Sequence, residues 1–494
     1  MLKKKTPVTL GSSGSSSTSD NTTDNTTTTN TDTTAPTISS VSPTDNSTYN
    51  SPATTVAVIF SEAMSTGSIT TNTGDTTCSG SLLLSSDNFT TCIKMLATTA
   101  ASNSDKTFTA TPSDNLSGGT TFKLQITTSA TDTSSNPLAS AQTSNGLITT
   151  PSGSGTIKGS VKQDNGSALS GVSVSFAIYG STVDNTTTDS SGDFSKSLNS
   201  LGIYTLTYSK SGYLGATQSG TLATDNQTLV LGTLSQLAEG CLAGTVSGTI
   251  TDAVSGNTVS GVSLSVRSGV NVTSGSTTGI TATTDSSGNY SFSSVSAGWY
   301  TVQTSKSGYT DGYFNIHSCS RVTGQDASIT TTLSSEIMRI VLSWPTGSTA
   351  SDLDSHLTIP DNASSRYHIF YSKKKFYYAT NSSTCSGCDS SDNVTLDRDD
   401  QNGAPGTETI TITKIRSGIY RYSVHDFTNR GTSSSTKLAT SGASVKVFYN
   451  DNTTTFSVPN LAGNLWGVFT FDNSSGSFTA SDNMSAQSTL ENIQ

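Results

Sequence analysis

Short runs of alternating apolar and polar residues recur along this chain of 494 residues. Examples are VSVSF, TLTYSK, TITIT and RYSVHDF, bounded by Gly, Asn, Asp or other polar residues. Successive side chains of a strand point to opposite faces of its sheet, so these runs predict half-buried strands. Stretches with helical periodicity and caps are almost lacking. We therefore predict an all-β chain, divided into several domains because a single core rarely extends beyond about 300 residues.

The charge balance limits the partners of this chain. There are 25 lysine and arginine residues against 35 aspartate and glutamate residues, a formal net charge of −10. A phosphate backbone is repelled on average, and the sequence has no basic stripe interleaved with aromatic residues, so we expect no nucleic-acid partner. Its apolar runs fall short of the roughly 18 residues of a membrane span, so we expect no transmembrane segment.

Both ends of the chain have the composition of unstructured segments. Residues 1–34 begin with MLKKK, like the charged start of a secretory signal, but a Ser/Thr/Asn-rich tract follows in place of an apolar segment. Such a tract cannot bury apolar area, so we expect a disordered, solvated linker. We also expect that the signal sequence is missing from the reading frame or that the start is misassigned. Residues 481–494 are predicted to form a flexible tail.

The cysteines indicate an oxidising compartment. An even number of cysteines in a polar all-β chain favours disulfides and export. Pairing within each domain predicts the disulfides Cys78–Cys92, Cys241–Cys319 and Cys385–Cys388. For the CSGC segment at 385–388, a zinc half-site and a redox dithiol are the alternatives, but a second C-x-x-C and a βαβ setting are lacking. The predicted location is extracellular or at the cell surface, associated with the outer membrane.

Two neighbouring segments are near-copies of each other. TDSSGDF at 188–194 and TDSSGNY at 284–290 are each preceded by a Gly-rich strand pattern and followed by GIYTLTYSKSGY or GWYTVQTSKSGY. Order and spacing recur, so these are tandem copies of one building block. Asp189 and Asp285 are suited to bond their own backbone, and Gly192 and Gly288 to supply a positive φ. A structural turn explains the repeat better than a repeated active site.

Both copies resemble the carboxypeptidase regulatory-like domain, a transthyretin-like sandwich. The resemblance rests on the G-x-V-x-G-x-V opening, the T-D-x-x-G-x-Y turn and the closing K-x-G-Y, and it covers 151–238 and 239–334. It implies modules that accompany an enzyme or receptor without catalysing its reaction.

Residues 35–150 have a recurrent set of strand-end and turn positions, namely Phe60, Ser61, Glu62, Met64, Phe122, Asp132, Asn136, Pro137 and Leu138. In these positions the segment resembles the SbsA-like bacterial Ig-like domain. The resemblance implies an adhesive stalk or spacer module.

Residues 335–480 hold much of the chain's chemistry. The positions that stand out are Trp344, Asp352, Asp354, His356, Asp397, Asp399 and Glu408. In these positions the segment resembles a YfaP-like extracellular bacterial sandwich, which implies a fold but no settled activity.

The acidic residues of this module suggest a cation site. Asp352 and Asp354 alternate and so face one side of a strand. In DRDDQNGAPGTE, Asp397, Asp399, Gln401 and Glu408 stand at positions 1, 3, 5 and 12, a spacing that mimics a calcium loop, although position 6 is not Gly and flanking helices are absent. The sequence favours a solvated acidic turn whose Asp side chains bond their own backbone. The alternative is a Ca²⁺ site, with Asp352, Asp354, Asp397, Asp399 and Glu408 as candidate ligands and Ca²⁺ as the candidate cofactor.

Histidine and aromatic residues leave further alternatives open. His356, His368 and His425 are interpreted as hydrogen-bonded structural residues, with a catalytic or metal cluster as the alternative and no catalytic residue assigned. The aromatic run RYHIFYSKKKFYY is either a sugar-stacking face, with Tyr367, Tyr371 and Tyr377 exposed, or a row of core and edge residues.

Together these patterns predict a non-enzymatic, elongated, monomeric surface protein. Its spacer domains would present the C-terminal sandwich for adhesion, to other surface proteins or to polysaccharide. The alternatives are a carbohydrate-binding or envelope-attached accessory protein, and a metal-assisted hydrolase that uses Asp352, Asp354, Asp397 and His425.

Overall fold

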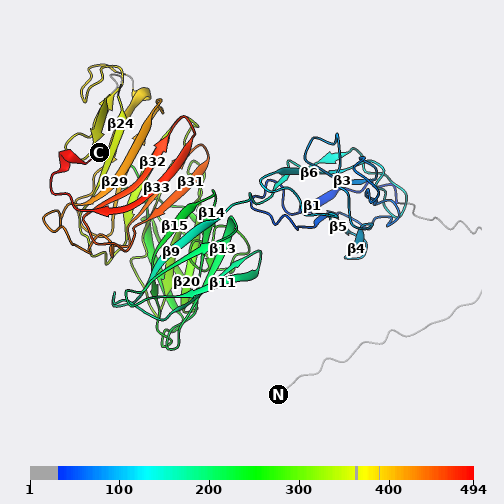
Figure 1. Cartoon of the computed structure of the whole chain (residues 1–494), viewed down its shortest axis with the longest axis horizontal. Helices are drawn as coiled ribbons and strands as arrows, with labels where there is room; N and C mark the ends of the chain where they lie inside the picture. The colour runs from blue at the N-terminus through cyan, green and yellow to red at the C-terminus, as the bar shows by residue number, and fades with distance from the viewer. Residues whose placement is uncertain (1–31, 362–364, 389, 494) are drawn as a thin grey trace, which may run out of the picture. The chain divides into compact units, whose positions relative to one another are not determined.

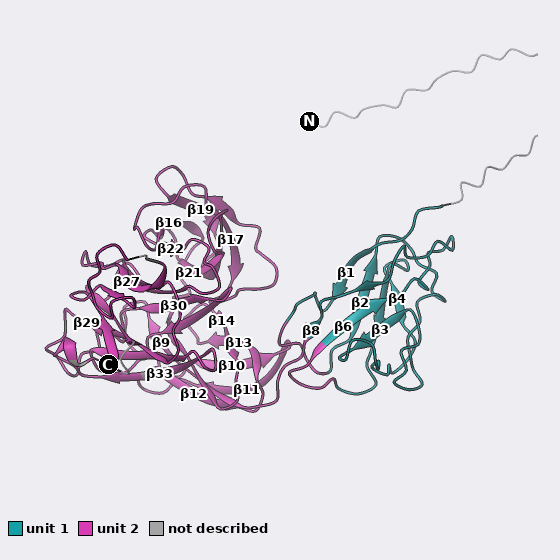
Figure 2. Ribbon diagram, turned by 90° about the horizontal axis from the view of Figure 1, so that it is seen from above, with its two compact units in different colours: residues 1–47, 53–115, 122–147 teal, residues 48–52, 116–121, 148–494 magenta. Residues whose placement is uncertain are grey.

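The computed structural model describes residues 32–361, 365–388 and 390–493. The all-β prediction is confirmed: of the described residues, 48% are in strands and 1% in helices, in several β-sandwich domains. By contacts, the chain divides into two compact units (Figure 2). Unit 1 comprises residues 1–47, 53–115 and 122–147, and unit 2 comprises 48–52, 116–121 and 148–494. The predicted linker at 1–34 lies, up to residue 31, outside the described residues.

The first module, predicted at 35–150, contains two sheets. One sheet has the order β1-β2-β5-β4, and the other is built from β3, β6, β7 and β8. Alternate residues of β2 are buried, although its sequence, VAVIF, is apolar throughout. The strands are β1 (Ile38–Ser42), β2 (Val56–Phe60), β3 (Leu82–Ser85), β4 (Ala100–Ser102), β5 (Thr107–Ala110), β6 (Thr121–Ile126), β7 (Gln142–Thr143) and β8 (Leu147–Ile148).

The two repeated modules have the same topology. In the first, a three-stranded sheet β12-β9-β15 faces a four-stranded sheet β11-β10-β13-β14; in the second, the corresponding orders are β19-β16-β22 and β18-β17-β20-β21. The first module has β9 (Gly155–Gln163), β10 (Ser173–Ile178), β11 (Ser181–Thr187), β12 (Asp193–Leu198), β13 (Gly202–Ser209), β14 (Ala216–Leu222) and β15 (Gln227–Gln236). The second has β16 (Gly244–Asp252), β17 (Ser263–Ser268), β18 (Thr281–Thr283), β19 (Asn289–Val295), β20 (Gly298–Ser305), β21 (Gly312–Ser318) and β22 (Ala327–Ile329).

The repeated turn is a structural device in both modules. The Asp189 carboxylate accepts hydrogen bonds from the backbone N–H groups of Ser191 (2.8 Å) and Asp193 (3.0 Å), and Asp285 makes the equivalent pair. Gly192 follows with a φ of 78°. A Cβ there would stand 2.3 Å from the Val161 carbonyl oxygen, so glycine is required. The aspartates are occupied by their own turns.

The C-terminal sandwich packs a six-stranded sheet against a five-stranded sheet (Figure 1). The first has the order β26-β27-β28-β23-β30-β31, with β23 (Met338–Trp344), β26 (Lys375–Tyr377), β27 (Asn393–Arg398), β28 (Gly406–Ile412), β30 (Ser444–Tyr449) and β31 (Asn452–Ser457). The second has the order β25-β24-β29-β32-β33, with β24 (Leu353–Pro360), β25 (Arg366–Ile369), β29 (Ile419–Asp426), β32 (Leu465–Asp472) and β33 (Ser477–Ser485). Trp344 and Trp466 are buried in the core between the sheets.

The chain beyond residue 480 has structure where the sequence predicts a flexible tail. β33 extends to Ser485, and a 3₁₀ helix, η2 (Leu490–Asn492), follows it; another, η1 (Ser390–Asp392), precedes β27. Leu490 and Ile493 are buried against Phe370. These two apolar side chains, with hydrogen bonds made by Gln487, join the short polar segment to the sandwich, and composition alone does not reveal such contacts.

The modules of unit 2 contact one another through buried groups. Val341 and Phe448 of the C-terminal sandwich pack against Ala253 of the second repeated module. The buried guanidinium of Arg339, on the first strand of the sandwich, donates to the hydroxyls of Thr330 and Thr331 at the end of the second repeated module. Trp299 of the second repeat donates from Nε1 to the Ser235 carbonyl of the first at 2.8 Å. The modules of this unit therefore share packed interfaces.

The structure pairs the cysteines as predicted. Disulfides join Cys78 to Cys92, Cys241 to Cys319 and Cys385 to Cys388. Within the described residues, no helix has the length and the apolar character that crossing a membrane requires.

Candidate metal-binding site in the C-terminal sandwich

The sandwich brings three of the predicted ligands together. Asp354 lies on β24 of one sheet, Glu408 lies on β28 of the other, and Asp399 follows β27. Each offers one carboxylate oxygen, and these oxygens lie within 4.8 Å of one another. Three carboxylates from both sheets thus converge at one point.

Glu408 reaches this point from inside the sandwich. It shares a face of β28 with Ile410 and Ile412, which belong to the hydrophobic core, and its exposed fraction is 0%. Its Oε2 accepts a hydrogen bond of 2.5 Å from the backbone N–H of Ser355 on the opposite sheet. A charged group held in this way is costly unless the rest of its hydrogen-bonding capacity is also met.

That capacity is not met by the protein. Within the described residues, every buried carboxylate oxygen that lacks a hydrogen-bond partner belongs to this cluster: Asp352 Oδ1, Asp354 Oδ2, Asp399 Oδ1 and Glu408 Oε1. Unsatisfied buried polar atoms are rare in proteins, and each one calls for an explanation such as a bound ion or water.

Burial and mutual repulsion act on the same carboxyl groups. Burial, with the charges of Asp352 and Asp399, raises the pKa of Asp354 to about 7. Burial, with the charge of Asp354, also raises the pKa of Glu408 well above its usual range. Asp352 lies beside the group, and its pKa is raised by burial and then by Asp399. Full ionisation of the cluster would therefore place more negative charge here than the surroundings compensate, and without a cation these carboxyl groups tend to hold protons.

The nearby cations compensate this charge only in part. Lys374 pairs with Asp399 Oδ2 at 2.8 Å from a half-exposed position, while Arg430 opposes the pKa shifts of Asp352 and Asp354.

Asp397, the fifth predicted ligand, is not brought to the cluster. The pairing of β27 with β28 shifts register between Leu396 and Arg398, which marks a bulge at Asp397. The Asp397 carboxylate accepts a hydrogen bond from Thr411 and lies near Arg339, on the face of β28 opposite to Glu408. The loop-like spacing of the sequence is here a bulged strand, so position 1 of the expected calcium loop points away.

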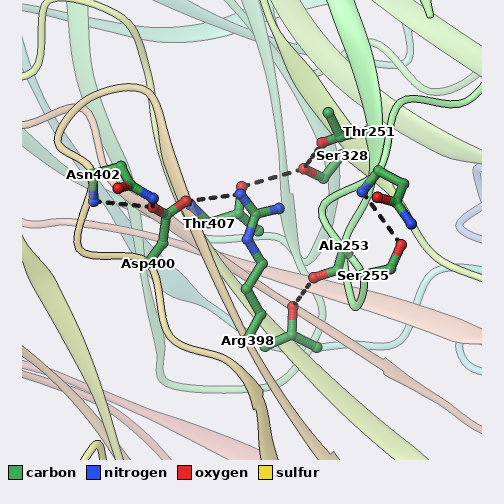
Figure 3. Close-up of polar contacts among 10 residues, drawn as sticks. Thr251, Ala253, Ser255, Ser328, Arg398, Asp400, Asn402 and Thr407 are labelled. Atoms are coloured by element: carbon green, nitrogen blue, oxygen red, sulfur yellow. Dashed lines mark hydrogen bonds and ion pairs between the residues drawn. The ribbon is translucent and has the colours of Figure 1, made fainter.

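The segment after Asp399 is anchored by Asp400, which the sequence reasoning did not single out (Figure 3). The buried Asp400 carboxylate accepts from Arg398 at 2.8 Å and from the backbone N–H groups of Thr407 and Asn402, both at 3.2 Å. The Thr407 and Ser328 hydroxyls lie 3.2 Å apart. These contacts hold the segment that leads to Glu408 against the second repeated module.

The three histidines of this module also converge, and their rings are hydrogen-bonded, as the sequence interpretation expects. Asp354, His356 and His425 each offer one ligand atom within 4.8 Å of the others. His356 Nδ1 lies 2.9 Å from His368 Nε2, and burial lowers the pKa of all three imidazoles, that of His368 to about 4. The alternation of Asp354 and His356 was visible in the sequence, but the pairing of β24 with β29 was not.

The aromatic residues of the predicted sugar-stacking face are largely engaged in packing. The Tyr367 ring lies 4.5 Å from Phe376, centroid to centroid, and the Tyr371 ring lies 5.7 Å from Phe427. Tyr367, Tyr371 and Tyr377 are all half-buried. The three tyrosines do not form an exposed row. Carbohydrate binding itself stays a prediction.

Comparison with known families identifies three of the modules. A model of the bacterial Ig-like domain matches residues 32–150, and a model of the carboxypeptidase regulatory-like domain matches residues 156–235 and 245–334. The chain carries one bacterial Ig-like domain and two carboxypeptidase regulatory-like domains. The resemblance of residues 335–480 to YfaP-like sandwiches stays a prediction. A search of curated proteins found no match.

Solved structures give only remote similarities. A streptococcal ancillary pilin is 15% identical, with 48% of this chain and 80% of that chain covered and a TM-score of 0.15. The Bacillus anthracis TIE protein is 14% identical, with 86% and 73% covered and a TM-score of 0.17. The shaft pilin SpaA from Lactobacillus rhamnosus GG is 13% identical, with 37% and 98% covered and a TM-score of 0.15. TM-scores this low support no conclusion about function.

Proposed function

We propose that this chain is a non-enzymatic, modular protein of the cell surface whose C-terminal sandwich binds Ca²⁺. The bacterial Ig-like and carboxypeptidase regulatory-like domains act as spacers, and the sandwich is presented for contact with other surface proteins or polysaccharide. The calcium ligands are Asp352, Asp354, Asp399 and Glu408. Export, surface attachment at an outer membrane and adhesion belong to this proposal.

The unpartnered carboxylate oxygens carry the calcium proposal. Four such oxygens are buried at one place, and three ligand atoms lie within 4.8 Å of one another. Calcium binds oxygen at about 2.3–2.6 Å, so ligands on opposite sides of one ion stand roughly 4.6–5.2 Å apart. The spacing of the carboxylates therefore suits a single ion.

The chemistry of the ligands favours calcium over other metals. An all-oxygen set of carboxylates suits a hard cation, and calcium tolerates irregular geometry where magnesium demands a near-ideal octahedron. A site of this kind in an extracellular module binds with a Kd on the order of 10⁻⁴–10⁻³ M.

The burial of Asp354 and His425 favours a structural ion over a catalytic ion. A hydrolytic site needs ionisable groups that converge in an accessible pocket. The exposed fractions of Asp354 and His425 are 4% and 0%, and Asp397 points elsewhere. A bound ion here would fix the two sheets of the sandwich to each other.

The test is the thermal unfolding of the full chain in EDTA and in 10 mM Ca²⁺. Ligand linkage predicts a stabilisation of about 1.4–2.7 kcal/mol at 10 to 100 times the Kd. Glu408→Gln keeps the shape of the side chain and should lose most of this gain, whereas the matched change Asp397→Asn should retain it. An unchanged unfolding temperature of the wild-type chain at 10 mM Ca²⁺ would refute the site.

A further inference from the structure

A second group of buried, unpartnered atoms lies beside the carboxylates. Asp354 and His356 alternate along β24 and so share one face of the strand. His425 on β29 is the direct cross-strand partner of Asp354. Pairing and alternation together place one carboxylate and two imidazoles side by side, on residues far apart in the sequence.

Each of the three side chains is almost fully enclosed. The exposed fractions are 4% for Asp354, 1% for His356 and 0% for His425. Within the described residues, Asp354 Oδ2, His356 Nε2 and His425 Nδ1 have no hydrogen-bond partner. One ligand atom from each of the three residues lies within 4.8 Å of those of the other two. If the histidines were merely structural, three buried polar atoms would remain unsatisfied at one point.

The hydrogen bonds of the other ring nitrogens leave lone pairs where a metal needs them. His425 Nε2 lies 2.9 Å from the Gln487 carbonyl oxygen. A carbonyl only accepts, so Nε2 carries the proton and Nδ1 of the neutral ring is a free lone pair. His356 Nδ1 lies 2.9 Å from His368 Nε2, and a proton on His356 Nδ1 leaves Nε2 equally free.

We propose that Asp354, His356 and His425 bind a borderline divalent metal ion of the zinc class. Two imidazoles and one carboxylate are a ligand set that zinc-class ions accept and that calcium, which prefers oxygen, does not. His368 and the Gln487 carbonyl act as positioning groups that fix the tautomer and orientation of the ligand rings, as partners of metal-bound histidines usually do.

The surroundings assign this ion a structural role. Phe370 stacks on His356, with ring centroids 5.6 Å apart, and packs in turn against Leu490 and Ile493. The end of the chain lies beside β24 and β29 (Figure 1), and its Gln487 holds His425. The metal would therefore link the C-terminal segment to the five-stranded sheet and be closed off from substrate.

This site and the calcium site are separable although they share Asp354. A carboxylate has two oxygens and can bridge two ions, while His356 and His425 serve only the second site and Asp399 and Glu408 only the first. Replacing His356 or His425 should therefore leave Ca²⁺ binding intact, and replacing Asp399 or Glu408 should leave Zn²⁺ binding intact.

The experiment is a Zn²⁺ titration of the EDTA-stripped, dialysed full chain by calorimetry, with Co²⁺ as a spectroscopic probe. We expect one tight Zn²⁺ site per chain, and ligand-field absorption from Co²⁺ of the kind that nitrogen ligands produce. His356→Gln and His425→Gln should each weaken Zn²⁺ binding at least about 100-fold. His317→Gln is the matched control, since His317 packs on Trp299 in another module.

Calcium-dependent stabilisation distinguishes the two sites. It should persist in His425→Gln, which also shows that the variant is folded, and Glu408→Gln should keep its Zn²⁺ affinity. Absence of tight Zn²⁺ binding to the wild-type chain would overturn the proposal, whether or not Ca²⁺ stabilises the chain. Unchanged Zn²⁺ affinity in both histidine variants would overturn it as well.

Discussion

The contact between the second carboxypeptidase regulatory-like domain and the C-terminal sandwich makes a quantitative prediction. The Thr409 hydroxyl, with an exposed fraction of 0%, donates to the Ala253 carbonyl at 2.6 Å. Thr409→Val keeps the shape of the side chain and leaves this buried carbonyl without its donor. Such a loss costs about 1–3 kcal/mol. If the two modules unfold together, the sandwich itself should be destabilised by that amount.

Urea unfolding followed by tryptophan fluorescence measures this effect. The chain has 3 tryptophans, so a Trp299→Phe background leaves Trp344 and Trp466 as reporters of the sandwich. The control is Thr395→Val, on the neighbouring strand of the same sheet. A change at Thr409 no larger than the change at Thr395 would refute the coupling and favour modules that fold independently.

Three further predictions concern stability. Replacing Cys241 and Cys319 with serine should lower the unfolding free energy by about 4 kcal/mol under non-reducing conditions, since their loop spans 78 residues; equal stability of variant and wild type in urea would contradict this. Gly192→Ala should destabilise by well over the roughly 1 kcal/mol expected of Gly212→Ala, because only at Gly192 does a Cβ meet the backbone; equal urea midpoints would count against it. Burial lowers the pKa of Lys446 from 10.5 to about 8. Between about pH 8 and 10.5, Lys446 is therefore charged in the unfolded chain and neutral in the folded chain. The unfolding free energy of the wild type should rise relative to Lys446→Met by up to about 3 kcal/mol over that window, and a flat difference in pH-dependent urea midpoints would exclude it.

Local patterns predicted the fold well. The alternation in TLTYSK (residues 205–210) indicates a half-buried strand, which the structure contains as β13, and Asp189 with Gly192 indicates the turn that the structure contains. Both depend on neighbours in sequence, where the geometry of the chain itself dictates the outcome.

The candidate site was predicted only in part, because it depends on how strands pair. Asp354, Asp399 and Glu408 come together as expected, but a bulge turns Asp397 to the other face of the sheet. His425 joins Asp354 because β24 pairs with β29 in one particular register. Register across a sandwich is set by its whole core, so sequence spacing carries no trace of it.

A crystal structure of the full chain grown with millimolar Ca²⁺ would show directly whether the carboxylate cluster holds an ion. We predict density for one ion, coordinated at about 2.3–2.6 Å by oxygens of Asp354, Asp399 and Glu408. If density is lacking and Glu408 instead shares a proton with Asp399 or Asp354 in a short carboxyl–carboxylate hydrogen bond, the buried cluster is satisfied without a metal and the calcium proposal is contradicted.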